Sequence, residues 1–160
     1  MDTLGRHCIV ELYGCDPSRL DDLEGTRRAL RRATGAVGAT AVGEVFHRYA
    51  PQGVTGVVLI AESHLSVHTW PEARYAAVDI FTCGGLDPHP AVGVLARALE
   101  ASRAVVTETE RGRVAGGNRA LSVAPPEEAP APPRVTTLHA PFLTPPAGDK
   151  PPQEPTKRGS

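Results

Sequence analysis

The chain has 160 residues, a formal net charge of −1 and interleaved acidic and basic side chains. This length suits one domain, and without a basic stripe beside its few aromatic residues we expect no nucleic-acid partner. No apolar run reaches the length of a membrane span, and the N-terminus lacks a signal-peptide pattern, so we expect no membrane role. Three cysteines without a CxxC pair favour reduced thiols and a cytoplasmic location.

The proline distribution divides the chain into two parts. Of the 16 prolines, 11 follow residue 124. Such a composition cannot bury enough apolar surface to offset the entropy of ordering the chain. We therefore predict a folded domain over residues 1–114 and a disordered, Pro-rich C-terminal tail over 115–160.

The first two elements follow from periodicity and capping residues. Alternating apolar and polar residues predict a strand over 6–13. Asp16 and Pro17 are a typical N-cap and first helical residue, and leucines at near-helical spacing extend a helix over 17–34 with Gly35 as its C-cap.

The remaining elements are mostly strands. Four strand candidates follow the helix, at residues 39–50, 54–63, 65–70 and 75–81. Asp87 and Pro88 start a second helix, and 103–110 is the last strand. The order β-α-β-β-β-β-α-β with hairpin-like connections predicts an α+β fold, a two-layer α/β sandwich with an antiparallel sheet covered by two helices on one face.

Reactive side chains concentrate in IAESHLSVHTWPE, residues 60–72. A regular strand with one polar face is the simplest interpretation. A metal site would use His64, His68 and Cys83, but a strand separates the two histidines by about 13 Å, so we expect no metal. The pair Glu62-Ser63 offers a third interpretation, because a serine on a strained backbone can attack the preceding carbonyl and form an ester that eliminates and hydrolyses to a pyruvoyl group.

The wider sequence favours the third interpretation. Residues 53–85, GVTGVVLIAESHLSVHTWPEARYAAVDIFTCGG, resemble the prokaryotic S-adenosylmethionine decarboxylase proenzymes, which carry GVSGVVVI-ESH-S-HTWPE-GYAA-D-FTCG. Three further segments extend the resemblance over residues 4–113: LGRHCIVELYGCD, FHRYAPQG and ERGR. The resemblance implies a self-cleaving, pyruvoyl-dependent decarboxylase that makes the aminopropyl donor for spermidine biosynthesis.

The resemblance also implies roles for individual residues. Cleavage between Glu62 and Ser63 would give a β chain of residues 1–62 and an α chain that begins at residue 63 with the pyruvoyl group, whose ketone forms a Schiff base with the substrate. Cys83 would protonate the α-carbon, and His68 would donate or accept a proton during self-cleavage. Thr55 stands where the family usually has a serine implicated in processing.

Pyridoxal phosphate is not expected as the cofactor. It requires a lysine Schiff base, and the lysines of this chain, Lys150 and Lys157, both lie in the predicted tail.

For the adenosyl sulfonium substrate, S-adenosylmethionine, Tyr49 and Trp70 are the candidate stacking partners and Glu72 is the candidate ribose acceptor. The sequence leaves two questions open: which residue is the partner of Ser63 and which is the partner of Asp79. Ser63 and His68 differ by an odd number, so either a bulge or bend lies between them or His64 or Ser66 is the closer partner.

A charge within the strand at 75–81 also needs a partner. Asp79 is that charge, and Arg6 and Arg48 are its candidate partners. The small core and the family resemblance favour a homodimer of processed protomers. The alternatives are a pyruvoyl-dependent arginine or ornithine decarboxylase on the same fold, and a non-catalytic regulatory paralogue.

Overall fold

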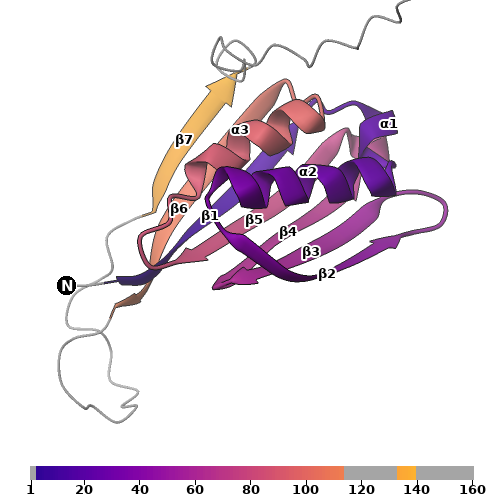
Figure 1. Cartoon of the computed structure of the whole chain (residues 1–160). Helices are drawn as coiled ribbons and strands as arrows, with labels where there is room; N and C mark the ends of the chain where they lie inside the picture. The colour runs from indigo at the N-terminus through magenta and orange to yellow at the C-terminus, as the bar shows by residue number, and fades with distance from the viewer. Residues whose placement is uncertain (1–2, 114–132, 140–160) are drawn as a thin grey trace, which may run out of the picture.

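The computed structural model describes residues 3–113 and 133–139. They form one antiparallel sheet in the order β2-β3-β4-β5-β1-β6-β7, with helices on one face (Figure 1). The strands are β1 Thr3–Tyr13, β2 Thr40–Arg48, β3 Val54–Ala61, β4 Ser63–Trp70, β5 Tyr75–Cys83, β6 Arg103–Arg113 and β7 Arg134–His139. The helices are α1 Pro17–Leu20, α2 Leu23–Ala36 and α3 His89–Ala98, and η1 Pro71–Ala73 is a 3₁₀ turn. The predicted two-layer α+β sandwich is confirmed.

The first predicted helix is two helices. Asp16 caps α1 as predicted, accepting from the backbone N–H groups of the first turn. A second carboxylate, Asp22, then accepts from the N–H of Gly25 at 2.9 Å and starts α2. Since both aspartates are N-caps, the chain breaks between them. The predicted C-cap at Gly35 is also wrong, because α2 continues to Ala36 and the first left-handed glycine after it is Gly38, with φ of 74°.

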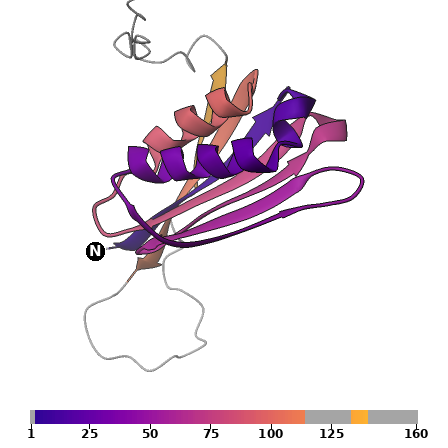
Figure 2. The same ribbon diagram turned by 45° about the vertical axis from the view of Figure 1, so that its right-hand side comes forward.

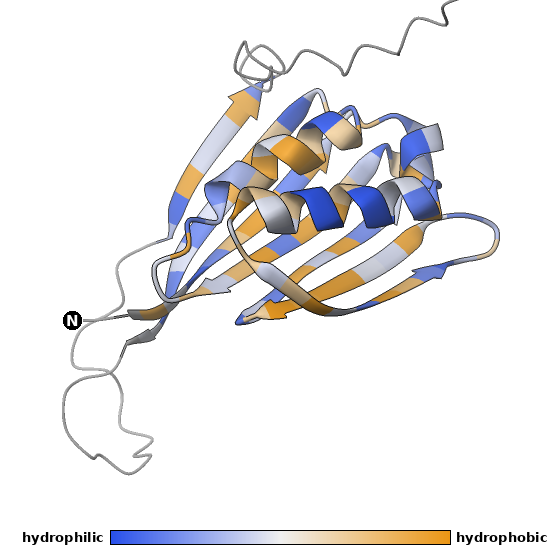
Figure 3. Cartoon of the chain, viewed as in Figure 1, coloured by the Kyte–Doolittle hydropathy of each residue, from blue (hydrophilic) through white to orange (hydrophobic). Residues whose placement is uncertain are grey.

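One face of the sheet packs against α2 and α3. Side chains alternate along each strand, and the residues that point toward the helices form one core cluster in which Leu12, Leu65 and Ile80 are fully buried. Figure 3 shows this alternation as bands of hydrophobic and polar residues along the strands. Burying each such side chain stabilises the fold by about 1.5–3 kcal/mol relative to leaving it exposed.

The other face of the sheet has no helix over it (Figure 2). We call it the open face. It carries alternate residues of β1 to β6, among them apolar side chains that stay exposed: Val45 at 74%, Leu59 at 51% and Ile9 at 39%. Exposed apolar side chains of this size on one face are typical of an association surface.

One strand lies within the segment whose composition predicts a tail. β7 pairs antiparallel with β6, from Glu108 opposite Arg134 to Arg103 opposite His139. Its one half-buried side chain, Leu138, packs against the core cluster. The strand was not predicted because its six residues lie in a seven-residue run without proline inside a segment that is Pro-rich as a whole. The rest of the predicted tail lies outside the described residues.

Candidate functional site

The pair Glu62-Ser63 lies in the tight turn between β3 and β4. Ile60 pairs with Ser63, so Ala61 and Glu62 alone connect the two strands. Ser63 has a φ of 109°, a backbone conformation that side-chain-bearing residues rarely adopt. Such a conformation costs about 1–3 kcal/mol and persists only where the surrounding structure enforces it. The strained backbone is therefore at the serine that would attack its own preceding carbonyl.

Cys83 ends the strand next to Ser63. Ser63 pairs with Thr82 on β5, so Cys83 is one residue further toward the same end of the sheet. Its side chain is half-buried and on the open face. On the other side of Cys83 lies Gly5 of β1, which places no side chain beside the thiol. The structure thus brings Ser63 and Cys83 to the same end of the sheet, with Cys83 on the open face and Ser63 opposite Thr82, whose side chain is buried on the helix side.

Thr55 and His68 form a pair at the other end. Thr55 Oγ1 and His68 Nδ1 lie 2.5 Å apart across the β3–β4 ladder. The bulge considered between Ser63 and His68 is absent, because the register of β4 with β5 is continuous from Ser63 to Trp70. Five residues of strand separate Ser63 from His68 by about 16 Å. Within one copy of the chain, His64 and Ser66 both lie closer to Ser63 than His68 does.

Aromatic rings surround His68. The rings of His68 and Trp70 lie 4.0 Å apart edge to face, and Trp70 stacks on Tyr75 at 5.2 Å. Tyr49, the residue after β2, has its ring 5.7 Å from that of His68. The predicted stacking residues Tyr49 and Trp70 are therefore neighbours, and Tyr75 joins them although the sequence analysis did not select it. Aromatic rings gathered in this way can stack against a purine ring.

Two carboxylates border the aromatic group. Glu72, in the turn η1 directly after Trp70, accepts a hydrogen bond from Gln52 Nε2 at 3.0 Å. This contact holds Glu72 at the end of the sheet where Trp70 lies. Glu11 accepts a hydrogen bond from the Tyr75 hydroxyl. Burial and that hydrogen bond raise the pKa of Tyr75, so its hydroxyl stays protonated at neutral pH.

Asp79 lies in the middle of the open face, and neither predicted arginine is its partner. Asp79 Oδ1 lies 3.2 Å from His7 Nε2, and its Oδ2 accepts from the Ser66 hydroxyl at 3.1 Å. Arg6 instead pairs with Glu108 at 2.6 Å, and Arg48 pairs with Asp21 at 2.5 Å. Both arginines point to the helix side of the sheet, whereas Asp79 is on the open face. The alternation of side chains along a strand determines this difference, and the prediction did not take it into account.

The other two thiols differ from Cys83. Cys8 and Cys15 are fully buried in the core cluster. Burial raises the pKa of each to about 11, so neither is a thiolate at neutral pH.

Comparison with known proteins places this site in a family. Residues 6–112 match the family model described as S-adenosylmethionine decarboxylase. The chain belongs to the S-adenosylmethionine decarboxylase family. Two relatives named S-adenosylmethionine decarboxylase proenzyme are each 50% identical to it. The one from Thermotoga petrophila matches over 71% of this chain and 88% of its own length, and the one from Caldanaerobacter subterraneus over 70% and 91%.

A solved structure extends the comparison to the fold. The crystal structure of the adenosylmethionine decarboxylase from Aquifex aeolicus superposes with a TM-score of 0.67 at 36% identity, covering 75% of this chain and all of that one. The decarboxylase family match contains every site residue selected from the sequence, from Tyr49 to Cys83. It ends at residue 112, before β7.

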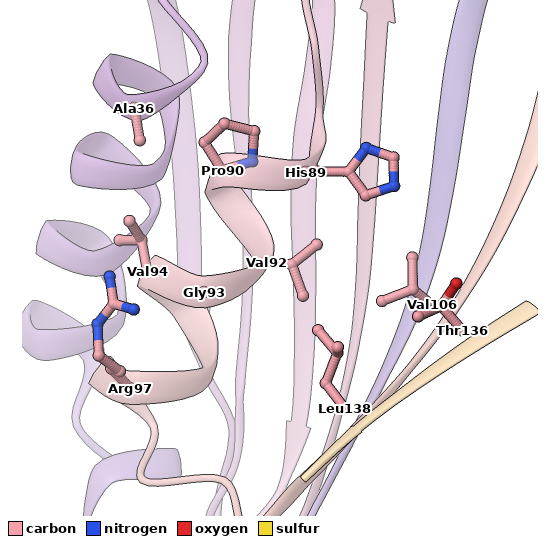
Figure 4. A pocket seen from close by; sticks show the side chains of 10 residues that line it. All are labelled: Ala36, His89, Pro90, Val92, Gly93, Val94, Arg97, Val106, Thr136 and Leu138. Atoms are coloured by element: carbon pink, nitrogen blue, oxygen red, sulfur yellow. The ribbon is translucent and has the colours of Figure 1, made fainter. Parts of the chain in front are cut away.

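A cavity of about 490 Å³ lies away from these residues. It opens between α3 and the β6–β7 edge, on the helix side of the sheet, and Val92, Val106 and Leu138 form its apolar wall (Figure 4). None of the decarboxylase site residues lines it. Within residues 3–113 and 133–139, no cluster of His, Cys, Asp or Glu is arranged to hold a metal ion. No helix in the described part of the chain has the length and apolarity needed to cross a membrane.

Proposed function

We propose that the chain cuts itself between Glu62 and Ser63 and, with the resulting pyruvoyl group, decarboxylates S-adenosylmethionine to the aminopropyl donor of spermidine biosynthesis. The observation that carries this proposal is the left-handed backbone of Ser63 in a tight turn beside Cys83, inside the family match.

Self-cleavage begins at the serine hydroxyl. The Ser63 oxygen attacks the Glu62 carbonyl carbon, the peptide C–N bond breaks, and the amine takes up a proton. Elimination across the Ser63 side chain then releases Glu62 as a carboxylate, and hydrolysis replaces the nitrogen of residue 63 by oxygen and frees ammonia. Relief of the strained φ at Ser63 favours the first step, because the ester no longer holds that residue in a peptide turn.

A homodimer would bring Ser63 close to the Thr55–His68 pair, although the two lie far apart within one copy. The Thr55–His68 pair lies about 16 Å along β4 from Ser63, too far to exchange a proton with it. If two open faces pack together with their β4 strands antiparallel, His68 of the second copy lies over Ser63 of the first. A two-fold axis makes both sites equivalent, and the exposed Val45, Leu59 and Ile9 supply apolar surface for the contact.

The same packing assembles a substrate site. The aromatic rings of Tyr49 and Trp70 from one copy bind the adenine, and Glu72 accepts hydrogen bonds from the ribose hydroxyls. The pyruvoyl group supplies a carbonyl that takes up the electrons released with CO₂. Cys83 then delivers a proton to the α-carbon from its position beside residue 63.

Intact mass spectrometry tests the self-cleavage. We expect two chains, residues 1–62 and 63–160, with a ketone at the start of the second, and one uncut chain for Ser63→Ala. Released CO₂ is then measured with S-adenosylmethionine, arginine and ornithine as substrates. Turnover of the adenosyl substrate alone supports the proposal. Turnover of arginine or ornithine alone assigns a different decarboxylase, and an uncut wild-type chain refutes the proposal as a whole.

Co-expression of two inactive variants tests the shared site. His68→Ala alone is expected to stay uncut. When it is paired with Ser63→Ala, a mixed dimer contains one site with both Ser63 and His68, so part of the His68→Ala chain should be cut. Absence of cleavage in the mixture, with mixed dimers present in native mass spectra, shows that His68 acts within its own copy or not at all.

A further inference from the structure

Arg111 lies on the open face at the Ser63 end of the sheet. Gly5 of β1 pairs with Cys83 on one side and with Arg111 of β6 on the other. Two strand spacings therefore separate the backbones of Cys83 and Arg111, about 10 Å. Between them Gly5 leaves room for Phe81, since a Cβ at Gly5 would come within 2.7 Å of that ring.

The guanidinium of Arg111 packs on the Phe81 ring and has N–H donors that are not used in the contact with His7. Its central carbon is 5.4 Å from the Phe81 ring centroid, and its Nη1 is 3.0 Å from His7 Nδ1. No carboxylate among the described residues lies within ion-pair distance of it, whereas Arg6 and Arg31 both have such partners. A guanidinium has five N–H donors, so a neutral imidazole leaves most of its capacity for an anion unused.

The contact with His7 is fixed by a chain of hydrogen bonds. The Ser66 hydroxyl donates to Asp79 Oδ2, and Asp79 Oδ1 accepts from His7 Nε2. A carboxylate accepts only, so His7 carries its proton on Nε2 and turns an unprotonated Nδ1 to Arg111. The Ser66, Asp79 and His7 side chains thereby hold the guanidinium over Phe81 without neutralising its charge.

We propose that Arg111 binds the α-carboxylate of the substrate, the group that leaves as CO₂. This inference rests on the proposed function. The substrate amine is joined at residue 63, the α-carbon is the next atom, and Cys83 must reach that carbon, so the carboxylate lies within the space bordered by Ser63, Cys83 and Phe81. Arg111 is the cation that borders this space, and its planar fork matches a carboxylate with two parallel hydrogen bonds.

His64 completes the border on the side of Ser63. It follows Ser63 in β4, and its ring meets the Phe81 ring edge to face at 5.9 Å. Phe81 thus contacts both the neighbour of the cleavage site and the arginine.

The test compares ligands with and without the carboxylate. In Arg111→Gln we expect the KM for S-adenosylmethionine to rise about 10- to 100-fold, the range of a hydrogen bond to a charged group. The inhibition constant of decarboxylated S-adenosylmethionine, which lacks that carboxylate, should change less than twofold. Arg111→Lys keeps the charge without the fork and should give an intermediate rise. Arg28→Gln, an exposed arginine on the helix side, makes the same charge change and should alter neither constant.

Each failure points to a different step. If the wild-type enzyme releases no CO₂ from S-adenosylmethionine, the proposed function is wrong. If the wild type is active and Arg111→Gln weakens the binding of substrate and product equally, or weakens the binding of neither, the assignment of Arg111 is wrong. Should Arg111→Gln stay uncut, the ratio of the two constants in Arg111→Lys decides the question alone.

Asp79 is a positioning residue in this proposal. Asp79→Ala removes the acceptor that fixes His7, so the KM for substrate should rise by less than in Arg111→Gln while kcat and the product constant stay close to the wild type. Because both changes act on one contact, the double variant should have a KM no higher than that of Arg111→Gln. Additive effects would show that Asp79 acts elsewhere.

Discussion

Replacing Ser63 by glycine and by alanine separates backbone strain from chemistry. Both variants lack the hydroxyl, so both remain single uncut chains under the proposed function. At a φ of 109°, alanine keeps the strain of the native serine, and glycine relieves it. The strain is worth about 1–3 kcal/mol, and glycine loses about 0.5–1 kcal/mol more chain entropy on folding. The difference predicts that Ser63→Gly is more stable than Ser63→Ala by about 0.5–2 kcal/mol.

Urea unfolding at one protein concentration measures the difference, because the apparent stability of the proposed dimer depends on concentration. Thermal unfolding should show the same order, at roughly 3–5 °C per kcal/mol for a domain of this size. Ser66 provides the matched control on the same strand. It lies in the regular part of β4 and has no left-handed φ, so there glycine should be the less stable variant by about 0.5–1 kcal/mol. Equal stabilities at position 63, or alanine the more stable, would refute the assignment of strain to Ser63.

Three further outcomes follow from the geometry. Thr55→Val removes the hydroxyl that contacts His68 and should slow self-cleavage by about 10²- to 10⁴-fold in time courses on denaturing gels, whereas Thr55→Ser should cleave at least as fast as the wild type. Iodoacetamide should modify Cys83 first, with loss of activity in parallel, because the other two thiols are fully buried with a raised pKa; peptide mass spectrometry that finds either of those modified first contradicts this. A hydrogen bond from Arg48 lowers the pKa of Asp21, so Asp21 stabilises the fold above its unfolded pKa of about 4 and loses that contribution as pH falls through the lower folded value. Asp21→Asn should therefore be less stable than the wild type at pH 7, and the difference should shrink as pH falls below about 4 in chemical denaturation; a difference that is constant with pH contradicts the assignment.

Strand periodicity and capping residues predicted most of the fold because both are local signals. Asp16 before Pro17 marks the start of α1, and the alternation in β1 and β5 sets which side chains are buried. The same local rules missed the break before α2, where a second aspartate competes with the first for the role of N-cap. They also missed β7, whose stability comes from pairing with β6 and from one half-buried leucine.

The sequence selected the candidate site residues but did not predict how they are arranged. The motif selects Ser63, His68 and Cys83, and nothing in their spacing says that a regular strand holds the first two apart. The partner of Asp79 shows the same limit. Arg6 and Arg48 were chosen for their charge, whereas His7 faces Asp79 because β1 lies beside β5 in the sheet. Strand order is a long-range property, and pairwise charge does not encode it.

The separation along β4 explains why the two ends of one strand carry different chemistry. The Ser63 end holds a strained turn, the Cys83 thiol and Arg111, and the proposals place the bond that is cut and the carboxylate that leaves there. At the other end, His68 and the aromatic rings can bind and protonate but have no bond of their own copy within reach. A single sheet cannot fold one end of a strand onto the other, so under the proposed function these halves work together across a two-fold interface. The exposed apolar residues of the open face lie between the two ends, where such an interface would bury them.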